Sequence, residues 1–347
     1  MDRLPFRSRV LARFRLWFTS AAGISIAVAA LAATLTAIDQ GPYILVNTFV
    51  TGGMWGLMAM GLALLFGVMN ISNFAHGEYF MLGTLVAYYL FESITKYLVR
   101  TPNSILTLLA PIFAICGAAL AGLIAGVMTD KIVFLQLRKR SREEWIMNCF
   151  LITLGLSVIL INTHQLVVGT SYKGITQYWE VPPASILGVY ISVDRLFASI
   201  LAGIIIVIFW LYMKFTRIGQ AIRAVSQDES GALMAGISVN RIQTLAMAIS
   251  CGMAALAGGS LLFMYPSYPT VGLEPLYNSW FVIIVVGFGN VMGAIAGGFF
   301  IALLQVITRT YVGEGWEYVI PVMLIALILI LRPSGVFGSK VRGIWEQ

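Results

Sequence analysis

Few residues in this sequence have side chains that transfer protons, and the most suggestive ones share a single turn. Residues 70–78 read Asn-Ile-Ser-Asn-Phe-Ala-His-Gly-Glu, so that His76, one of two histidines, stands two positions from Glu78. A carboxyl group beside an imidazole is suited to carrying a proton. The same residues also fit a polar turn, in which Asn73 caps the backbone and Glu78 occupies the first turn of the next helix. Both interpretations make Asn70, Asn73, His76 and Glu78 candidate residues.

Sequence patterns that would identify an enzyme are missing. There is no phosphate-binding G-x-x-x-x-G-K-[ST] loop, no H-E-x-x-H or H-x-x-E-H pair and no G-x-S-x-G segment. Cys116, Cys149 and Cys251 stand in apolar sequence without a C-x-x-C pair, which indicates packing residues. We therefore predict that the chain is not an enzyme and has no catalytic residue, no cofactor-binding residue and no metal ligand.

The elements that must position these residues are apolar. Of the 347 residues, 59% are hydrophobic and 11% are charged, and the mean hydropathy is +0.89. This composition is far more apolar than that of a soluble domain, so we expect membrane lipid around the chain. The net charge of +7 comes from short basic clusters beside apolar runs. That pattern indicates membrane topology rather than a nucleic-acid partner.

Apolar stretches long enough to cross a bilayer recur along the chain. They are continuous rather than alternating, which favours helices over strands. The predicted spans are residues 16–38, 44–68, 74–91, 105–128, 145–167, 196–215, 242–264, 277–308 and 318–331.

The distribution of Lys and Arg predicts the orientation in a cell inner membrane, with a cytoplasmic N-terminus. Most of the 22 basic residues lie near the N-terminus, in 130–144, in 214–241 or near the C-terminus. Cytoplasmic segments carry such an excess. The predicted organisation is a basic cytoplasmic N-terminus (1–15), a transmembrane domain (16–338) with a cytoplasmic loop (214–241), and a cytoplasmic tail (339–347).

One predicted span must be interrupted. Nine simple crossings from a cytoplasmic N-terminus would leave the basic C-terminal tail outside the cell, whereas basic segments are expected in the cytoplasm. Residues 287–293, Gly-Phe-Gly-Asn-Val-Met-Gly, divide the long apolar stretch 277–308. We predict a short broken helix there, with Asn290 as a further candidate pathway or structural residue. The predicted fold class is an all-α polytopic membrane protein with about eight to ten transmembrane segments.

Two features of the predicted spans bear on packing and cargo. Glycines recur four residues apart, which lets helix backbones approach closely in a packed bundle. The pairs are Gly52 and Gly56, Gly122 and Gly126, and Gly293 and Gly297. The spans hold almost no charge, which favours a small neutral or zwitterionic cargo over an anion or a metal ion.

The cytoplasmic loop 214–241 is predicted to hold a short helix at about residues 227–234. Ser226 or Asp228 stands near its start, and Gly236 stands where it stops. The segment also contains the apolar residues Ala232, Leu233 and Ala235. A loop surrounded by water would not require such a run. We interpret this segment as a docking surface for a partner protein.

Four motifs, in this order, resemble the permease subunits of branched-chain amino acid ABC importers of the LivH type. They are Asn-Phe-Ala-His-Gly-Glu (73–78), Arg-Ala-Val-x-Gln-Asp-x-x-x-Ala-x-x-x-Gly-Ile (223–237), Gly-Phe-Gly-Asn-Val-Met-Gly-Ala-x-x-Gly-Gly (287–298) and Arg-Pro-x-Gly-x-Phe-Gly (332–338). The similarity spans roughly residues 43–338. The first motif separates this type from the LivM type, and urea importers use closely related permeases. The arginine-rich N-terminal extension and the outside segment 170–195 depart from the pattern.

The resemblance implies an ABC importer permease fold and a set of partners. These are a second permease subunit of the LivM type, two cytoplasmic ATPase subunits that bind ATP, and a periplasmic binding protein that delivers a branched-chain amino acid. It also implies that the 223–237 segment docks on the ATPase. The predicted docking residues are Arg223, Asp228, Ala232, Leu233, Gly236 and Ile237. A urea or amide importer, or an ion-coupled secondary carrier, stays open as an alternative.

Overall fold

The computed structural model describes residues 21–140, 145–186 and 188–331, and the predictions for the basic N-terminus and the C-terminal tail lie outside them. Helices make up most of this part, which confirms the predicted all-α class. Their bounds are α2 (Ala21–Gln40), α3 (Tyr43–Met69), α4 (His76–Arg100), α5 (Ser104–Thr129), η1 (Asp130–Phe134), α6 (Leu135–Arg140), α7 (Trp145–Val167), α8 (Val193–Phe215), α9 (Arg217–Gln227), α10 (Glu229–Met234), α11 (Val239–Ser260), α12 (Leu273–Val286), α13 (Val291–Tyr311), η2 (Glu314–Trp316) and α14 (Val319–Leu331). The strands β1 (Ala184–Ile186) and β2 (Val189–Ile191) form an antiparallel hairpin.

Six helices in the described part are long and apolar enough to cross a membrane. They are α3, the α5–α6 rod, α7, α8, α11 and α13. Helix α12 has 14 residues and spans about 21 Å at 1.5 Å per residue, which is less than the hydrocarbon thickness of about 30 Å. The predicted count of eight to ten segments needs α2, α4 and the α12 or α14 segments as well, and it stays a prediction.

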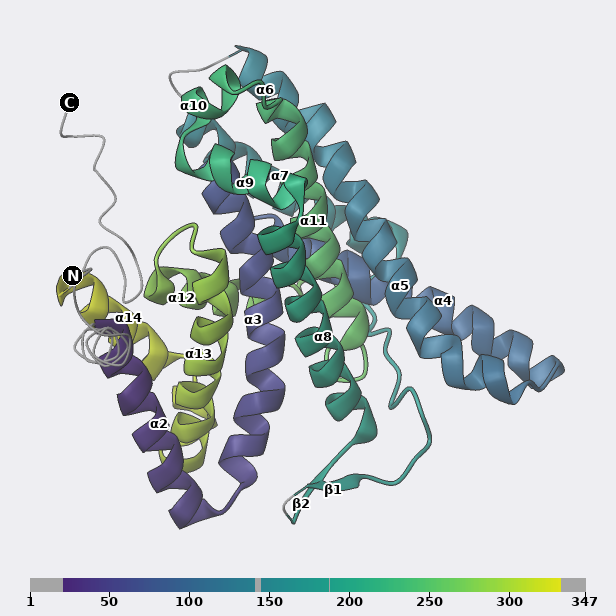
Figure 1. Cartoon of the computed structure of the whole chain (residues 1–347). Coiled ribbons are helices and arrows are strands. Elements are labelled where there is room, and N and C mark those ends of the chain that lie inside the picture. Colours follow the sequence, from purple (N-terminus) through teal and green to yellow (C-terminus); the bar gives the residue numbers. More distant parts are fainter. Residues whose placement is uncertain (1–20, 141–144, 187, 332–347) are drawn as a thin grey trace.

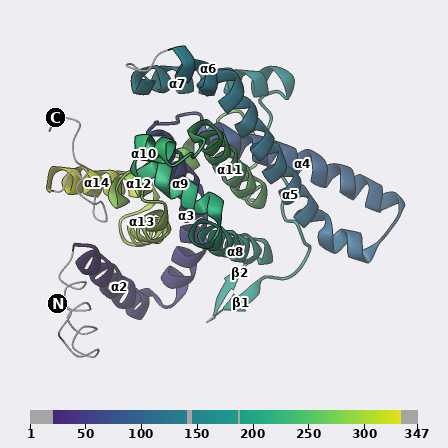
Figure 2. The ribbon, with the colours of Figure 1, turned by 45° about the horizontal axis from the view of Figure 1, so that its top comes forward.

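Helix α3 lies at the centre of the bundle, between α8 and α11 on one side and α12 and α13 on the other (Figures 1 and 2). Its middle part is apolar on every face, as expected of a membrane span or of a helix buried among others. Leu57, Met60, Leu62 and Leu64 are each at most 1% exposed. The bundle therefore forms around a single buried rod.

The predicted glycine pairs lie at three different helix contacts. Gly52 and Gly56 face α13, where Gly298 lies against the backbone of both. The pair at 122 and 126 faces α11, and the pair at 293 and 297 faces the valines of α12. Because dispersion forces require close approach and lipid supplies no hydrophobic drive between helices, these contacts hold the bundle together.

The predicted loop 130–144 is helical as far as Arg140, so this boundary was wrong. Helix α5 continues through the π-helical turn η1 into α6. Asp130 is fully buried and accepts two hydrogen bonds from Arg138, at 2.7 and 2.9 Å. Arg138 also donates to Gln243 of α11, and Thr244 donates to Asp130. The pairing lets a basic segment stay helical and packed against α11, because the buried charge is matched.

The predicted break in the 277–308 stretch is confirmed between α12 and α13. Gly287 and Gly289 have φ of 103° and 76°, a region that favours glycine. Phe288 stacks on Phe66 of α3, with ring centroids 4.5 Å apart. The chain therefore turns sharply and packs against the end of the central helix.

The bundle has two distinct ends, visible in Figure 1. Helices α6, α9 and α10 gather at one end, which we call the basic end because both predicted basic loops lie there. The β1–β2 hairpin and the α2–α3 corner lie at the other, which we call the hairpin end. Helices α4 and α5 project from the side as a pair (Figure 2).

We predict that Gly126→Ala destabilises the fold, whereas Gly203→Ala does not. A Cβ at Gly126 would stand 2.8 Å from both the Met247 carbonyl oxygen and the Ala248 Cα, which are backbone atoms that cannot move aside. Overpacking of this kind costs about 1–3 kcal/mol. At Gly203 of α8 a Cβ meets nothing within 4 Å, so alanine should be neutral or stabilising there. Thermal unfolding in detergent compares the two variants, and equal melting temperatures would refute the close-contact argument.

Candidate functional site

Two short helices, α9 and α10, form a compact element at the basic end. Thr216 begins α9: its hydroxyl accepts a hydrogen bond from the Gly219 amide at 3.0 Å and donates to the Tyr212 carbonyl at 2.7 Å. Ile222 and Val225 of α9 are buried in the bundle core. The sequence prediction missed α9 and placed only the following helix. The element is therefore fixed to the end of α8 rather than being a loop.

The predicted short helix is present as α10, and it ends at Gly236 as expected. Gly236 has φ of 80°, its amide donates to the Leu233 carbonyl at 3.0 Å, and the Ile237 amide donates to the Ala232 carbonyl at 3.0 Å. This pair of bonds is a Schellman motif. Asp228 stands between α9 and α10. The geometry gives α10 a defined direction at the surface.

The predicted docking residues divide into exposed and inward-facing ones. Leu233 is 54% exposed and its neighbour Met234 is 85% exposed. Ala232 is 4% exposed and packs into the core, so its predicted place on the docking surface is corrected. Ile237 is half-buried beside it. We define the coupling tip as Leu233 and Met234, two large apolar side chains presented to the surroundings at the basic end.

Arg223 belongs to the base of this element. Its Nη1 donates to the Met213 carbonyl at 2.6 Å, which ties α9 to the last turn of α8. A cation is favourable at a helix C-terminus, where carbonyl groups lack intrahelical partners. This bond explains an arginine at position 223 without any partner protein.

The candidate residues at 70–78 form a buried turn. Asn73 and His76 are fully buried. The Asn73 side chain accepts from the Ala75 amide at 3.0 Å, as in the predicted polar turn. The His76 ring nitrogens lie 3.3 Å from the Met58 carbonyl oxygen and 3.5 Å from the Ser250 hydroxyl. His76 therefore joins α4 to both α3 and α11.

Glu78 lies in the first turn of α4, as predicted, and faces α7. It is 1% exposed, and its Oε1 accepts a hydrogen bond from Ser157 at 2.8 Å. Thr153, one turn earlier on α7, donates to the Ser72 carbonyl at 3.2 Å. These two hydroxyls fasten α7 to the turn. The Oε2 of Glu78 is buried without a partner among the described residues, and a pathway role for Glu78 stays a prediction.

Asn70 and Asn290 stand at helix ends. Asn70 terminates α3 with φ of 53°, and asparagine tolerates this left-handed conformation. The Asn290 side chain accepts from the Gly293 amide at 2.9 Å and so begins α13. Both residues therefore stand at helix ends, and a pathway role for either stays a prediction.

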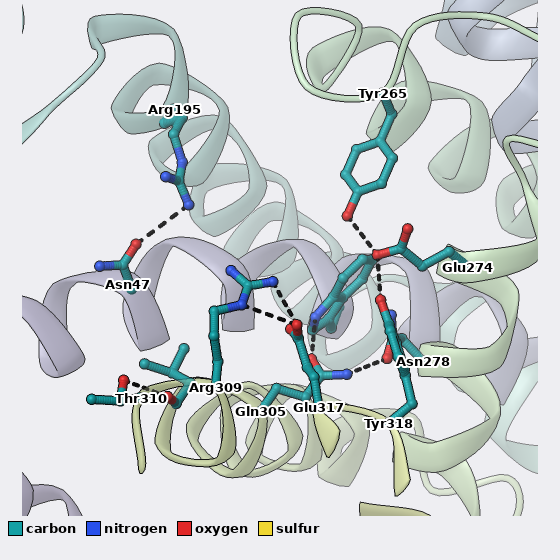
Figure 3. Close-up of polar contacts among 12 residues, drawn as sticks. Asn47, Arg195, Tyr265, Glu274, Asn278, Gln305, Arg309, Thr310, Glu317 and Tyr318 are labelled. Carbon is teal, nitrogen blue, oxygen red and sulfur yellow. Dashed lines mark hydrogen bonds and ion pairs between the residues drawn. The ribbon is translucent and has the colours of Figure 1, made fainter. Parts of the chain in front are cut away.

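A polar cluster near the hairpin end was not predicted. Figure 3 shows Arg195 of α8 directed at Asn47 of α3, and Tyr265 directed at Glu274 of α12. Arg309 of α13 binds Glu317 in an ion pair at 2.6 Å. The Glu274 Oε1 accepts from the hydroxyls of Tyr265 at 2.8 Å and Tyr318 at 2.6 Å. We call Asn47, Arg195, Tyr265, Glu274, Arg309, Glu317 and Tyr318 the hairpin-end cluster.

A buried chain of amides continues from this cluster toward the middle of α3. The Trp55 Nε1 donates to the Gln305 Oε1 at 3.0 Å, and the Gln305 Nε2 donates to the Asn278 Oδ1 at 2.6 Å. The rings of Trp55 and Tyr265 meet edge to face, with centroids 6.5 Å apart. Polar groups therefore extend inward beside the central helix.

The sequence shows the charges of the hairpin-end cluster but not their grouping. Arg195, Glu274 and Arg309 each stand just outside a predicted span, where charges are ordinary. Only the helix packing shows that α8, α12 and α13 bring these span ends together around α3.

Comparisons with known proteins find a matching family model and several relatives. A family model described as "Branched-chain amino acid transport system / permease component" matches residues 44–331. The permease protein LivH of Salmonella typhimurium is 23% identical over 84% of this chain and 94% of its own length. BraD of Pseudomonas aeruginosa is 25% identical (85% and 94%), and a probable LivH of Methanocaldococcus jannaschii is 26% identical (85% and 92%). No solved structure gives a significant match.

The family model covers most of the chain, and it ends with α14. The relatives named above are permeases of high-affinity or probable branched-chain amino acid transport systems. The buried central helix, the broken α12–α13 segment and the α9–α10 element all lie inside the matched region. The chain therefore belongs to the family of branched-chain amino acid ABC transport permeases and is a LivH-type permease subunit.

Proposed function

We propose that this permease carries branched-chain amino acids across the cell inner membrane, with its basic end in the cytoplasm. In this proposal the chain pairs with a second, LivM-type permease subunit and receives its cargo from a periplasmic binding protein at the hairpin end. Two ATPase subunits bind at the basic end and supply the energy. The names of the relatives support the substrate, and the excess of basic residues supports the orientation.

The coupling tip is the observation that carries the energy-coupling part of the proposal. Leu233 and Met234 are exposed on a short helix whose start and end are both fixed by the backbone. An apolar pair on a rigid base at the basic end suits the groove of a soluble partner. A movement of that partner would reach the bundle through α9, which contacts both α3 and α11.

Reconstitution of the chain with its ATPase subunits, sister permease and binding protein tests the transport proposal. We expect ATP-dependent uptake of L-leucine into proteoliposomes, because the energy comes from the ATPases. A proton or sodium gradient without ATP should drive no uptake. Gradient-driven uptake would refute the proposal in favour of a secondary carrier, and uptake of urea but not leucine would support the amide importer.

Charge placed on the coupling tip should weaken ATPase binding. In the double variant Leu233→Asp with Met234→Asp, two carboxylates face an apolar partner surface and must be desolvated there. We expect ATPase subunits to bind at least about tenfold more weakly, measured by co-purification and titration in detergent. Tyr190→Asp at the hairpin end, where the side chain is 79% exposed, is the matched control. Equal binding by both variants would rule out the tip as the contact.

The left-handed backbone conformation of Gly236 should be needed to couple ATP hydrolysis to uptake. Gly236→Ala forces a Cβ into the left-handed region, at a cost of about 1–2 kcal/mol, and so disfavours the observed direction of α10. We expect several-fold less uptake per ATP hydrolysed. Gly236→Asn should recover most of the coupling, because asparagine tolerates this conformation. Gly315→Ala, at a glycine with open space around it, is the control. Normal coupling in Gly236→Ala would show that the turn is not needed.

A further inference from the structure

Helix α8 runs from the hairpin end to the basic end, where α9 follows it (Figure 1), and it has two different faces. On the inner face, Ala198, Ala202 and Ile206 are buried in the bundle core. On the other face, apolar side chains recur at a spacing of three or four residues, which places them on one line along the helix. We call this line the outer stripe; its members are exposed, and they are Ile200, Ile204, Val207 and Leu211.

The outer stripe leads to a lysine. Lys214 follows Leu211 by three residues and stands in the last turn of α8. Its ammonium nitrogen lies 4.6 Å from the ring centre of Trp210 and 5.1 Å from that of Phe215. Both rings are exposed, Trp210 by 38% and Phe215 by 66%. A cation over aromatic faces is held in position while it keeps its charge and its N–H donors.

The length of α8 places this lysine at the surface of the membrane. The apolar span Val193–Phe215 has 23 residues and is about 34 Å long at 1.5 Å per residue. The hydrocarbon core is about 30 Å thick, so the last turn emerges from it. Tryptophan is typical of the boundary between hydrocarbon and water, and Trp210 stands one turn before Lys214. Lys214 therefore lies at the level of the lipid headgroups at the basic end.

The positive charge at this position is not compensated. Arg217, the first residue of α9, is exposed and stands three residues after Lys214. Within the described part of the chain, neither cation forms an ion pair, and the first turn of α9 has no acidic residue. We call Trp210, Lys214, Phe215 and Arg217 the α8–α9 corner. Two unpaired cations beside a membrane attract negatively charged headgroups.

We propose that the α8–α9 corner binds an anionic phospholipid in the leaflet at the basic end. Lys214 binds the phosphate group, Arg217 adds a second positive charge, and an acyl chain of the same lipid lies along the outer stripe. Every exposed side chain of α8 between Ile200 and Leu211 is aliphatic or aromatic, and the charges begin only at Lys214. This division matches the two parts of a lipid, whereas a free phosphate ion would leave the stripe uncovered.

Native mass spectrometry of the purified full chain in detergent tests the proposal, with dioleoyl phosphatidylglycerol and dioleoyl phosphatidylcholine as probes. We expect the anionic lipid to bind more tightly than the zwitterionic one. Lys214→Gln and Arg217→Gln should each weaken phosphatidylglycerol binding about fivefold, the effect of one basic residue at a membrane surface. Lys214→Arg keeps the charge and should retain the binding. Equal binding of the two lipids to the wild type would overturn the proposal.

Arg241→Gln is the matched control. Arg241 is an exposed cation at the start of α11, also at the basic end, but its neighbours Val239 and Ile242 are buried and offer no surface to an acyl chain. This variant should bind phosphatidylglycerol as the wild type does. Equal weakening by Arg241→Gln and Lys214→Gln would indicate diffuse attraction and overturn the site. Undiminished binding in both Lys214→Gln and Arg217→Gln would overturn it as well.

Two further measurements test the identity of the occupant. An excess of inorganic phosphate should not displace phosphatidylglycerol, because phosphate does not cover the outer stripe; full displacement would indicate a phosphate-ion site and overturn the lipid assignment. The titration is then repeated on the chain assembled with its sister permease and ATPase subunits, where we expect the lipid to be retained. Loss of the lipid on assembly would identify the outer stripe as a protein interface and overturn the proposal.

Discussion

The hydrocarbon core of the bilayer offers no hydrogen-bond partner and no hydrophobic drive between helices, and the structure follows from this constraint. Helix α3 is apolar on all sides, and the other helices bury its middle part. Those helices come close enough only because glycines remove the side chains at their contacts, as at Gly298 against α3. Stability of the bundle is therefore a matter of backbone distance more than of any particular apolar side chain.

The same constraint moves charge to the two ends. At the basic end, buried Asp130 is matched by Arg138, and this pair lets α5 extend as one rod beside α11. Near the hairpin end, Arg309 is matched by Glu317, while Arg195 and Glu274 are not matched within the described part. Between the ends, the hydrogen bond from Trp55 to Gln305 joins neutral groups, and the buried Glu78 accepts a hydrogen bond from Ser157. The two ends are joined by the helices packed on α3.

Sequence reasoning succeeded where the signal is local. Hydropathy located the six helices that are long and apolar enough to cross a membrane, glycines located the α12–α13 break, and Gly236 located the end of α10. Each of these depends on a few adjacent residues. It failed where tertiary contacts decide. The segment 130–144 is helical because Arg138 reaches Asp130 and Gln243, and α9 is stable because Ile222 and Val225 are buried in the core. The cluster at Arg195 and Glu274 joins helices that lie far apart in the sequence.

The incomplete pairing at Arg195 and Glu274 is explained by their partial burial. Asp130 is fully buried, and it is matched by Arg138. A deeply buried, unpaired charge would be costly. Half-buried groups lie between these limits. Such groups cost less than a deeply buried unpaired charge, so the bundle tolerates them without a partner of opposite charge among the described residues.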